Sequence, residues 1–203
     1  MDESGPQIYR GVPSRMKKIM KLADGPISIS TLRPEDETAL VNLIRRNLDS
    51  FEEAGSVLAS TFRRIDKLGA TYLQQGFAFF VVRDTGTGAC IGGAGLGPLA
   101  GLATSEGIGE IRELVIESSY RRRGIGGLLL GRCLEKAREY GYRRLYLETT
   151  PQMENAQKLF QRFGFRPVTQ SQSKKSAKAS EDTLPCYFML EDLTEAKARV
   201  PEA

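Results

Sequence analysis

The chain contains no histidine among its 203 residues, and this absence removes several kinds of chemistry at once. Neither a Ser-His-Asp nor a Cys-His arrangement is possible, so a general base has to be Glu, Asp, Tyr, Lys, Cys or a bound water. Cysteine is scarce as well, because Cys90, Cys133 and Cys186 lie far apart and form no Cys-x-x-Cys pair. We therefore expect no zinc or other metal site, and free thiols that fit a reducing, cytoplasmic compartment.

Long apolar runs are absent too. No segment approaches the length needed to cross a membrane, and the N-terminus lacks a signal-peptide core, so we expect no membrane contact. The length and the 27% of charged residues fit one globular domain. The net charge of +4 is compatible with a polyanionic cofactor, but it is too weak and dispersed to favour a nucleic acid as partner.

Apolar periodicity predicts the order of the secondary-structure elements. We expect strands at 27–32, 77–82, 89–96, 110–116, 144–149, 165–169 and 184–190, and helices at 34–48, 54–73, 125–140 and 152–163. Hairpins combined with one strand-helix-strand crossover indicate an α/β fold with a mixed sheet and helices on both faces. We expect a flexible basic tail over 1–25, one domain over 26–193 and a polar tail over 194–203.

The most informative stretch lies between a predicted strand and a predicted helix, at Arg121–Gly126. A basic, glycine-dense turn at a helix start suits a pyrophosphate, because the first helical N–H groups are unpaired and glycines admit a close anion. No Lys-Ser or Lys-Thr pair follows, which excludes a P-loop, and Leu129 stands where a dinucleotide fingerprint needs glycine. The remaining pattern, Arg-x-x-Gly-x-Gly, resembles the coenzyme A loop of GNAT acyltransferases. The alternative is an ordinary helix start with a solvated charge run.

Three further segments strengthen the resemblance to the GNAT (Gcn5-related N-acetyltransferase) superfamily. The segment Ala156–Phe165 is similar to the family's Ala-x-x-Leu-Tyr-x-x-x-Gly-Phe pattern, and Glu110–Ile116 resembles its fourth strand at the usual distance from the loop. Ser30–Asp36 resembles a common opening of the family. The likeness covers about 27–193, and it implies a GNAT fold with a mostly antiparallel sheet of about seven strands.

The resemblance also implies an acyl donor, acetyl-coenzyme A, and the residues that bind it. The backbone of Leu114, Val115 and Ile116 is expected to pair with the pantetheine arm as an added strand would. A free N–H there would stabilise the oxyanion of the thioester. The pyrophosphate is expected to lie on the loop and the helix start, at Arg121, Arg122, Arg123, Gly124, Ile125, Gly126, Gly127 and Leu128. The next helix of the family borders the cofactor, and its corresponding residues here are Ala156 and Phe160.

Glu110 is the leading candidate for the general base that deprotonates an amine acceptor. It stands where the resemblance places the catalytic glutamate of the family's histone acetyltransferases. Strand alternation predicts Glu110, Arg112, Leu114 and Ile116 on one face and Glu113 on the other. The alternative role for Glu110 is an exposed carboxylate paired with an arginine. Other candidates for the base are Glu113, Glu148 and a chain of water molecules.

Two positions depart from the family pattern. Phe160 stands where many relatives carry a tyrosine that protonates the leaving thiolate, and Met153 replaces a frequent asparagine. The thiolate can leave unaided, because thiol pKa values lie near about 8.5; Tyr120, Tyr146 or a water are other sources of the proton. Because of these departures, a non-catalytic acyl-coenzyme A sensor remains an alternative function.

Cys133 lies on an apolar helix face and is interpreted as a core residue.

The sequence predicts an N-acetyltransferase acting by direct transfer in a ternary complex on a small-molecule or peptide amine. No activated nucleophile is apparent that would form an acyl-enzyme. Phe51, Phe62, Arg63 and Arg64 are candidates for the acceptor pocket, with core packing or a solvated face as the alternative. A homodimer is compatible with the resemblance. Another alternative is a nucleic-acid-associated protein that uses the basic N-terminal tail.

Overall fold

The computed structural model describes residues 18–22, 25–48, 64–99, 107–168 and 186–193. Its centre is an eight-stranded sheet in the order β1-β2-β3-β4-β5-β6-β8-β7. Neighbouring strands are antiparallel except for β5 and β6, which are parallel. The strands are β1 Lys18–Leu22, β2 Gly25–Thr31, β3 Ala78–Asp84, β4 Cys90–Pro98, β5 Ile108–Ile116, β6 Arg144–Thr149, β7 Arg166–Val168 and β8 Cys186–Leu190. The predicted mixed, mostly antiparallel sheet is confirmed.

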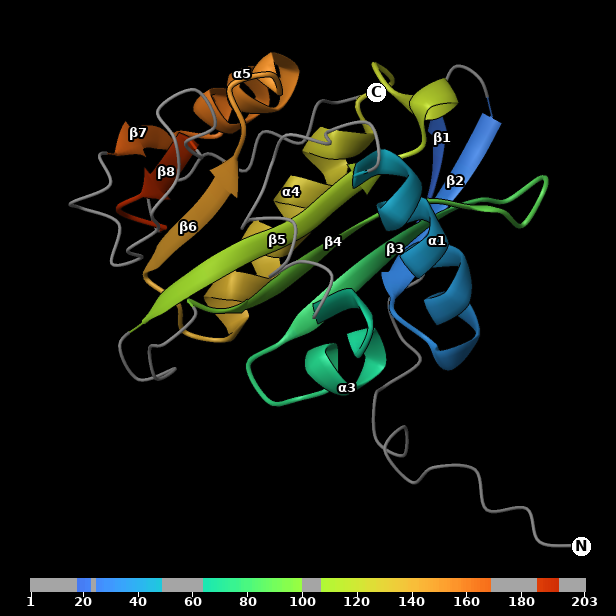
Figure 1. Ribbon diagram of the computed structural model, residues 1–203, viewed down its shortest axis with the longest axis horizontal. Helices are drawn as coiled ribbons and strands as arrows, with labels where there is room; N and C mark the ends of the chain where they lie inside the picture. Colours follow the sequence, from blue (N-terminus) through green and yellow to red (C-terminus); the bar gives the residue numbers. More distant parts are fainter. Residues whose placement is uncertain (1–17, 23–24, 49–63, 100–106, 169–185, 194–203) are drawn as a thin grey trace, which may run out of the picture.

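Helices cover both faces of this sheet, as predicted (Figure 1). One face carries α1 and α3, whose apolar residues pack with β3, and the other carries α4 and α5, which pack on the centre of the sheet. These elements are η2 Pro34–Asp36, α1 Glu37–Leu48, α3 Leu68–Tyr72, η5 Ser118–Tyr120, α4 Ile125–Glu139 and α5 Glu154–Arg162. In the described ranges, no helix is long and apolar enough to span a bilayer.

The described residues correct two boundaries. Lys18–Leu22, predicted as part of a flexible tail, forms β1 and pairs with β2 in antiparallel register. Backbone pairing explains the difference, because the outer edge of β2 gains hydrogen-bond partners that composition alone does not reveal. The helix expected over 54–73 is described only from 64 onward, where a turn at Asp66 and Lys67 separates helical residues 64–65 from α3 at Leu68–Tyr72. The remaining tail residues, 1–17 and 194–203, lie outside the described residues.

The glycines of β4 allow α3 to approach the sheet. A Cβ on Gly95 would lie 2.5 and 2.7 Å from two ring carbons of Tyr72, and one on Gly97 would lie 2.6 Å from the Phe77 ring. Tyr72 is 4% exposed and packs edge-on against Phe79, with ring centroids 4.9 Å apart. The glycine-rich sequence of β4 thus makes room for an aromatic layer between the sheet and α3.

This packing predicts that Gly95→Ala lowers the free energy of unfolding by about 1–3 kcal/mol, because the methyl group displaces a buried ring. Gly127→Ala is the matched control: its Cβ meets nothing nearer than 3.8 Å, and alanine is the better helix former by up to about 1 kcal/mol. Urea unfolding measures both variants. Equal midpoints for Gly95→Ala and the parent protein would contradict the close approach of Tyr72.

Candidate active site

β5 and β6 lie side by side over only part of their length. Their parallel pairing runs from Ile108 with Arg144 to Ile111 with Leu147. β5 then continues to Ile116, paired with β4 on its other side, while β6 continues along β8. Figure 1 shows the two strands separating toward the end at which α5 lies. The edge of β5 beyond Ile111 is therefore not occupied by β6, as required for an extended ligand that adds to the sheet.

A β-bulge interrupts β5 in this separated part. Gly95 pairs with Arg112 and Gly93 with Val115, so Glu113 and Leu114 together face the single residue Ala94 of β4. Glu113 has a φ of 47°, which is uncommon for a residue other than glycine. The bulge changes which side chains share a face of the sheet.

The face predicted for Glu113 is therefore wrong. Glu113 contacts Arg64 and the Tyr72 hydroxyl, so it lies on the α3 side, the side shared by Glu110 and Arg112. Leu114 and Ile116 pack on the opposite side, against the apolar cluster of α4 and α5. One inserted residue shifts the alternation, and strand periodicity cannot show the insertion.

The α3 side of β5 carries a buried cluster of charges. The Arg64 Nε donates to Glu113 at 2.6 Å, and the Glu113 side chain is 0% exposed. Arg112 donates to Glu110 at 2.7 Å and to the Pro98 carbonyl at 2.6 Å. The Glu110 and Arg112 side chains are 4% and 7% exposed. Glu110 is therefore paired with an arginine, as the alternative role predicted, but it is buried and not exposed. Each buried carboxylate has a cationic partner, as charges inside a protein require.

The cluster shifts the pKa values of its members. Burial, followed by the nearby Glu113 carboxylate, raises the pKa of Tyr72 well above its usual value, so its hydroxyl stays protonated and donates to Glu113. Burial lowers the pKa of Arg112, but the adjacent Glu110 and Glu113 outweigh it, and the net pKa is raised. Arg112 therefore stays charged beside both carboxylates.

The tyrosines considered as proton donors are engaged elsewhere. Tyr146 donates to Glu148 at 2.9 Å, and burial together with that carboxylate raises the pKa of Tyr146. Tyr120 donates to Asp84 at 2.8 Å, at the end of β3, and this hydrogen bond raises the pKa of Tyr120. In these contacts both hydroxyls donate to a carboxylate, and both are poorer acids than free tyrosine.

The glycine loop leads into the N-terminus of α4, as predicted. Gly124 has a φ of 79° at the N-cap, a conformation that favours glycine. The Leu128 N–H donates to the Gly124 carbonyl at 3.2 Å, so Leu128 is engaged within the helix. The N–H groups of Ile125, Gly126 and Gly127 precede that first helical bond and point out of the helix end, where the dipole favours an anion.

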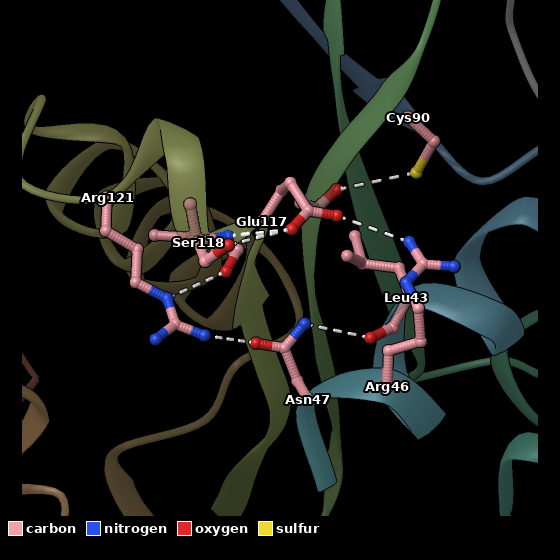
Figure 2. A network of polar contacts seen from close by, with 9 residues as sticks. Leu43, Arg46, Asn47, Cys90, Glu117, Ser118 and Arg121 are labelled. Atoms are coloured by element: carbon pink, nitrogen blue, oxygen red, sulfur yellow. Dashed lines mark hydrogen bonds and ion pairs between the residues drawn. The ribbon is translucent and has the colours of Figure 1, made fainter. Parts of the chain in front are cut away.

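Arg121 connects this loop to α1. Its guanidinium donates to the Ile116 carbonyl at 3.1 Å and to the Asn47 side chain, which in turn donates to the Leu43 carbonyl at 2.9 Å (Figure 2). Beside it, Arg46 of α1 pairs with Glu117 at 3.2 Å. Both contacts fix the C-terminal end of α1 against the turn after β5. Arg121 thus holds the loop in place, and its predicted contact with a pyrophosphate stays a prediction.

The other two arginines of the loop take different directions. Arg122 is exposed, has a φ of 66° and reaches Asn155 in the first turn of α5 at 3.4 Å. Arg123 donates to the Ser119 carbonyl at 2.8 Å and lies over the Tyr120 ring, 5.0 Å from its centroid. Of the three, Arg122 is the one that connects the loop to the start of α5.

The α5 segment packs on the same side as α4. Phe160 is buried, with ring centroids 6.2 Å from Phe165 and 6.1 Å from Phe188, while Ala156 is partly buried at the edge of this cluster. Cys133 is 0% exposed, and burial raises the pKa of its thiol to about 12. Its interpretation as a core residue is confirmed, because a buried neutral thiol is a poor nucleophile.

The predicted acceptor residues are only partly described. Phe51, Phe62 and Arg63 lie outside the described residues, whereas Arg64 is brought to Glu113. Sequence reasoning missed Tyr72 and Asn47, because helical spacing marks the first as an apolar-face residue and gives no sign of the second. Tyr72 does carry a signal: a tyrosine hydroxyl on a buried helix face needs a partner, and a nearby strand carboxylate supplies it.

Comparisons with known proteins agree with this geometry. Residues 43–165 match the sequence model of the acetyltransferase (GNAT) family. An uncharacterized N-acetyltransferase of Escherichia coli K12, YjgM, is 30% identical over 66% of this chain and 78% of its own length.

Solved structures share the fold at lower identity. A GNAT-family acetyltransferase of Staphylococcus aureus Mu50 is 18% identical with a TM-score of 0.66, over 82% of this chain and 99% of that one. The yncA protein of Salmonella typhimurium, solved with its cofactor acetyl-CoA, is 18% identical with a TM-score of 0.63, over 87% of this chain and 98% of that one. The family match includes the strands β3 to β6 and the glycine loop, and together with the relative of 30% identity it shows that this chain belongs to the GNAT acetyltransferase family and is an acyltransferase.

Proposed function

We propose that this protein transfers an acetyl group from acetyl-CoA to the primary amine of a small molecule or peptide, in a single ternary complex. The observation that carries the proposal is the spatial relation of two features. Among the described residues, the edge of β5 that no strand pairs with runs from Arg112 to Ile116, and the chain then leads directly through η5 and Gly124 into the N-terminus of α4. An extended arm that carries a pyrophosphate at one end fits this path.

The residues of this path fit acetyl-CoA. The N–H groups of Ile125–Gly127 and the Arg122 guanidinium would hold the pyrophosphate, and the edge of Leu114–Ile116 would pair with the amides of the pantetheine arm. The bulge places Glu113 and Leu114 opposite the single residue Ala94, and a backbone N–H left out of the ladder there would stabilise the oxyanion of the thioester. Bound acetyl-CoA supplies an activated acyl group, and these residues orient it.

The acceptor amine approaches from the α3 side, where the charged cluster lies. Its nitrogen attacks the thioester carbon, the carbon–sulfur bond breaks, and the electron pair of that bond leaves on sulfur. Glu110 takes the proton that the ammonium loses, directly or through a water molecule. The ion pair with Arg112, at 2.7 Å, fixes the position of the Glu110 side chain.

Release of free thiol from acetyl-CoA across a panel of amines tests the function. Turnover with amino acids, polyamines or peptides supports the proposal and identifies the acceptor class. Tight binding of acetyl-CoA without turnover on any amine favours a sensor, a role consistent with Phe160 and Met153 in place of tyrosine and asparagine.

The assignment of Glu110 predicts a change in the pH profile. An alkylamine has a pKa near about 10, so below that pH it must lose a proton before it attacks. Glu110→Gln is therefore expected to lower kcat/KM most at pH 6–7 and least near pH 10, with unchanged acetyl-CoA affinity. Glu113→Gln and Glu148→Gln are the comparison variants, and circular dichroism checks that each folds. A parallel pH profile for Glu110→Gln and the parent enzyme would remove Glu110 from this role.

The placement of Arg122 predicts a loss of donor affinity with no loss of stability. Asparagine tolerates the left-handed backbone at this position, so Arg122→Asn is expected to fold as well as the parent. Losing one exposed charge is expected to weaken acetyl-CoA binding about fivefold, less at high salt. Arg166→Asn removes the same charge on the exposed strand β7 and serves as control. Calorimetry at low and high salt measures all three proteins, and equal affinities would contradict the loop assignment.

A further inference from the structure

Thr149 lies at the point where β6 leaves β5. It is the last residue of β6, two positions beyond Leu147, where the pairing with β5 ends. On its other side it pairs with Cys186 of β8. Alternation places its side chain with those of Leu145 and Leu147, which pack in the α4–α5 core.

The same region contains Phe160. The Phe160 ring contacts Phe188 with centroids 6.1 Å apart, and Phe188 is the cross-strand partner of Leu147. Thr149 therefore follows Leu147 on the same face of β6, the face that α5 covers. Phe160 has no polar atom to offer a ligand here, whereas Thr149 has a hydroxyl.

Burial and hydrogen bonding distinguish this hydroxyl. Thr149 is 5% exposed, and among the described residues its Oγ1 has no hydrogen-bond partner. The neighbouring Thr150 Oγ1 is also buried without one. A buried hydroxyl without a hydrogen bond costs free energy, and such groups in native proteins call for a reason, a bound ligand among them.

We propose that the Thr149 hydroxyl hydrogen-bonds the sulfur of the acyl donor and stabilises the departing thiolate, in place of the tyrosine hydroxyl that Phe160 lacks. The inference rests on the proposed function. Threonine keeps its own proton; the sulfur leaves as an anion with the electron pair of the broken carbon–sulfur bond. A donated hydrogen bond strengthens as that charge develops, so it favours the transition state over the bound thioester.

Thr149→Val, which keeps the shape and removes the hydroxyl, tests this role, with coenzyme A as the probe. The thiol of coenzyme A ionises near about pH 8.5, so coenzyme A is mostly a thiolate at pH 9.5. At that pH, the affinity of Thr149→Val for coenzyme A is expected to be about tenfold lower than that of the parent protein. At pH 7 the difference is expected to be smaller. Thr149→Ser is expected to restore the parent behaviour at both values.

Stability of the free protein separates this role from a structural one. Thr149→Val is expected to unfold at the same or a higher temperature than the parent, because it removes a buried hydroxyl that has no partner in the part of the chain that the structure describes. Thr85→Val is the matched control: the Thr85 hydroxyl donates to the Pro26 carbonyl at 2.9 Å, so its loss is expected to lower the midpoint while coenzyme A affinity is unchanged.

Three results would overturn the inference: equal coenzyme A affinity for Thr149→Val and the parent, a difference that does not change with pH, or a fall in the unfolding temperature of free Thr149→Val like that of Thr85→Val. A parent protein that binds neither coenzyme A nor acetyl-CoA would instead overturn the proposed function.

Discussion

The parting of β5 from β6 after Ile111 and Leu147 is the constraint on which the rest of the structure depends. A parallel pair can separate within a sheet only if each strand is held on its other side. Here β4 holds β5 as far as Ile116, and β8 holds β6 as far as Thr149. The sheet therefore opens without losing its outer pairs, and the opening presents a strand edge to which an extended substrate can add.

The bulge in β5 builds the charged side of this opening. By placing Arg112 and Glu113 on the same face, it concentrates charge in a region that α3 buries. Buried carboxylates are tolerated only with partners, and Arg64, Tyr72 and Arg112 supply them. Tyr72 reaches Glu113 because Gly95 leaves space beneath its ring. The glycine in β4 and the carboxylate in β5 thus both position the Tyr72 side chain.

The turn after β5 joins the two sides of the sheet. Arg121 and Glu117 connect it to Asn47 and Arg46 of α1, while Gly124 leads into α4 on the opposite face. The loop expected to hold the donor is thus anchored to α1, a helix on the face of the sheet that also carries α3 (Figure 2). Its position is defined by polar contacts with α1 and by the packing of Tyr120 and Ile125 against the α4–α5 core.

The sequence by itself determined the family resemblance, the order of the strands from β2 onward and the glycine loop, because these depend on local periodicity and on residue types with special backbone properties. It also marked Cys133 as core from one helix face. Only the tertiary structure decided that Glu113 shares a face with Glu110, that Glu110 is buried with Arg112, that Arg121 reaches Asn47 and that Lys18–Leu22 is a strand. The reason is physical. The bulge in β5 depends on its register with β4, and the contacts of Glu113 with Arg64 and of Arg121 with Asn47 join residues 49 and 74 positions apart, so no local pattern encodes them. β1 and the Glu110–Arg112 pair are local in sequence, but apolar periodicity reveals neither backbone pairing nor burial.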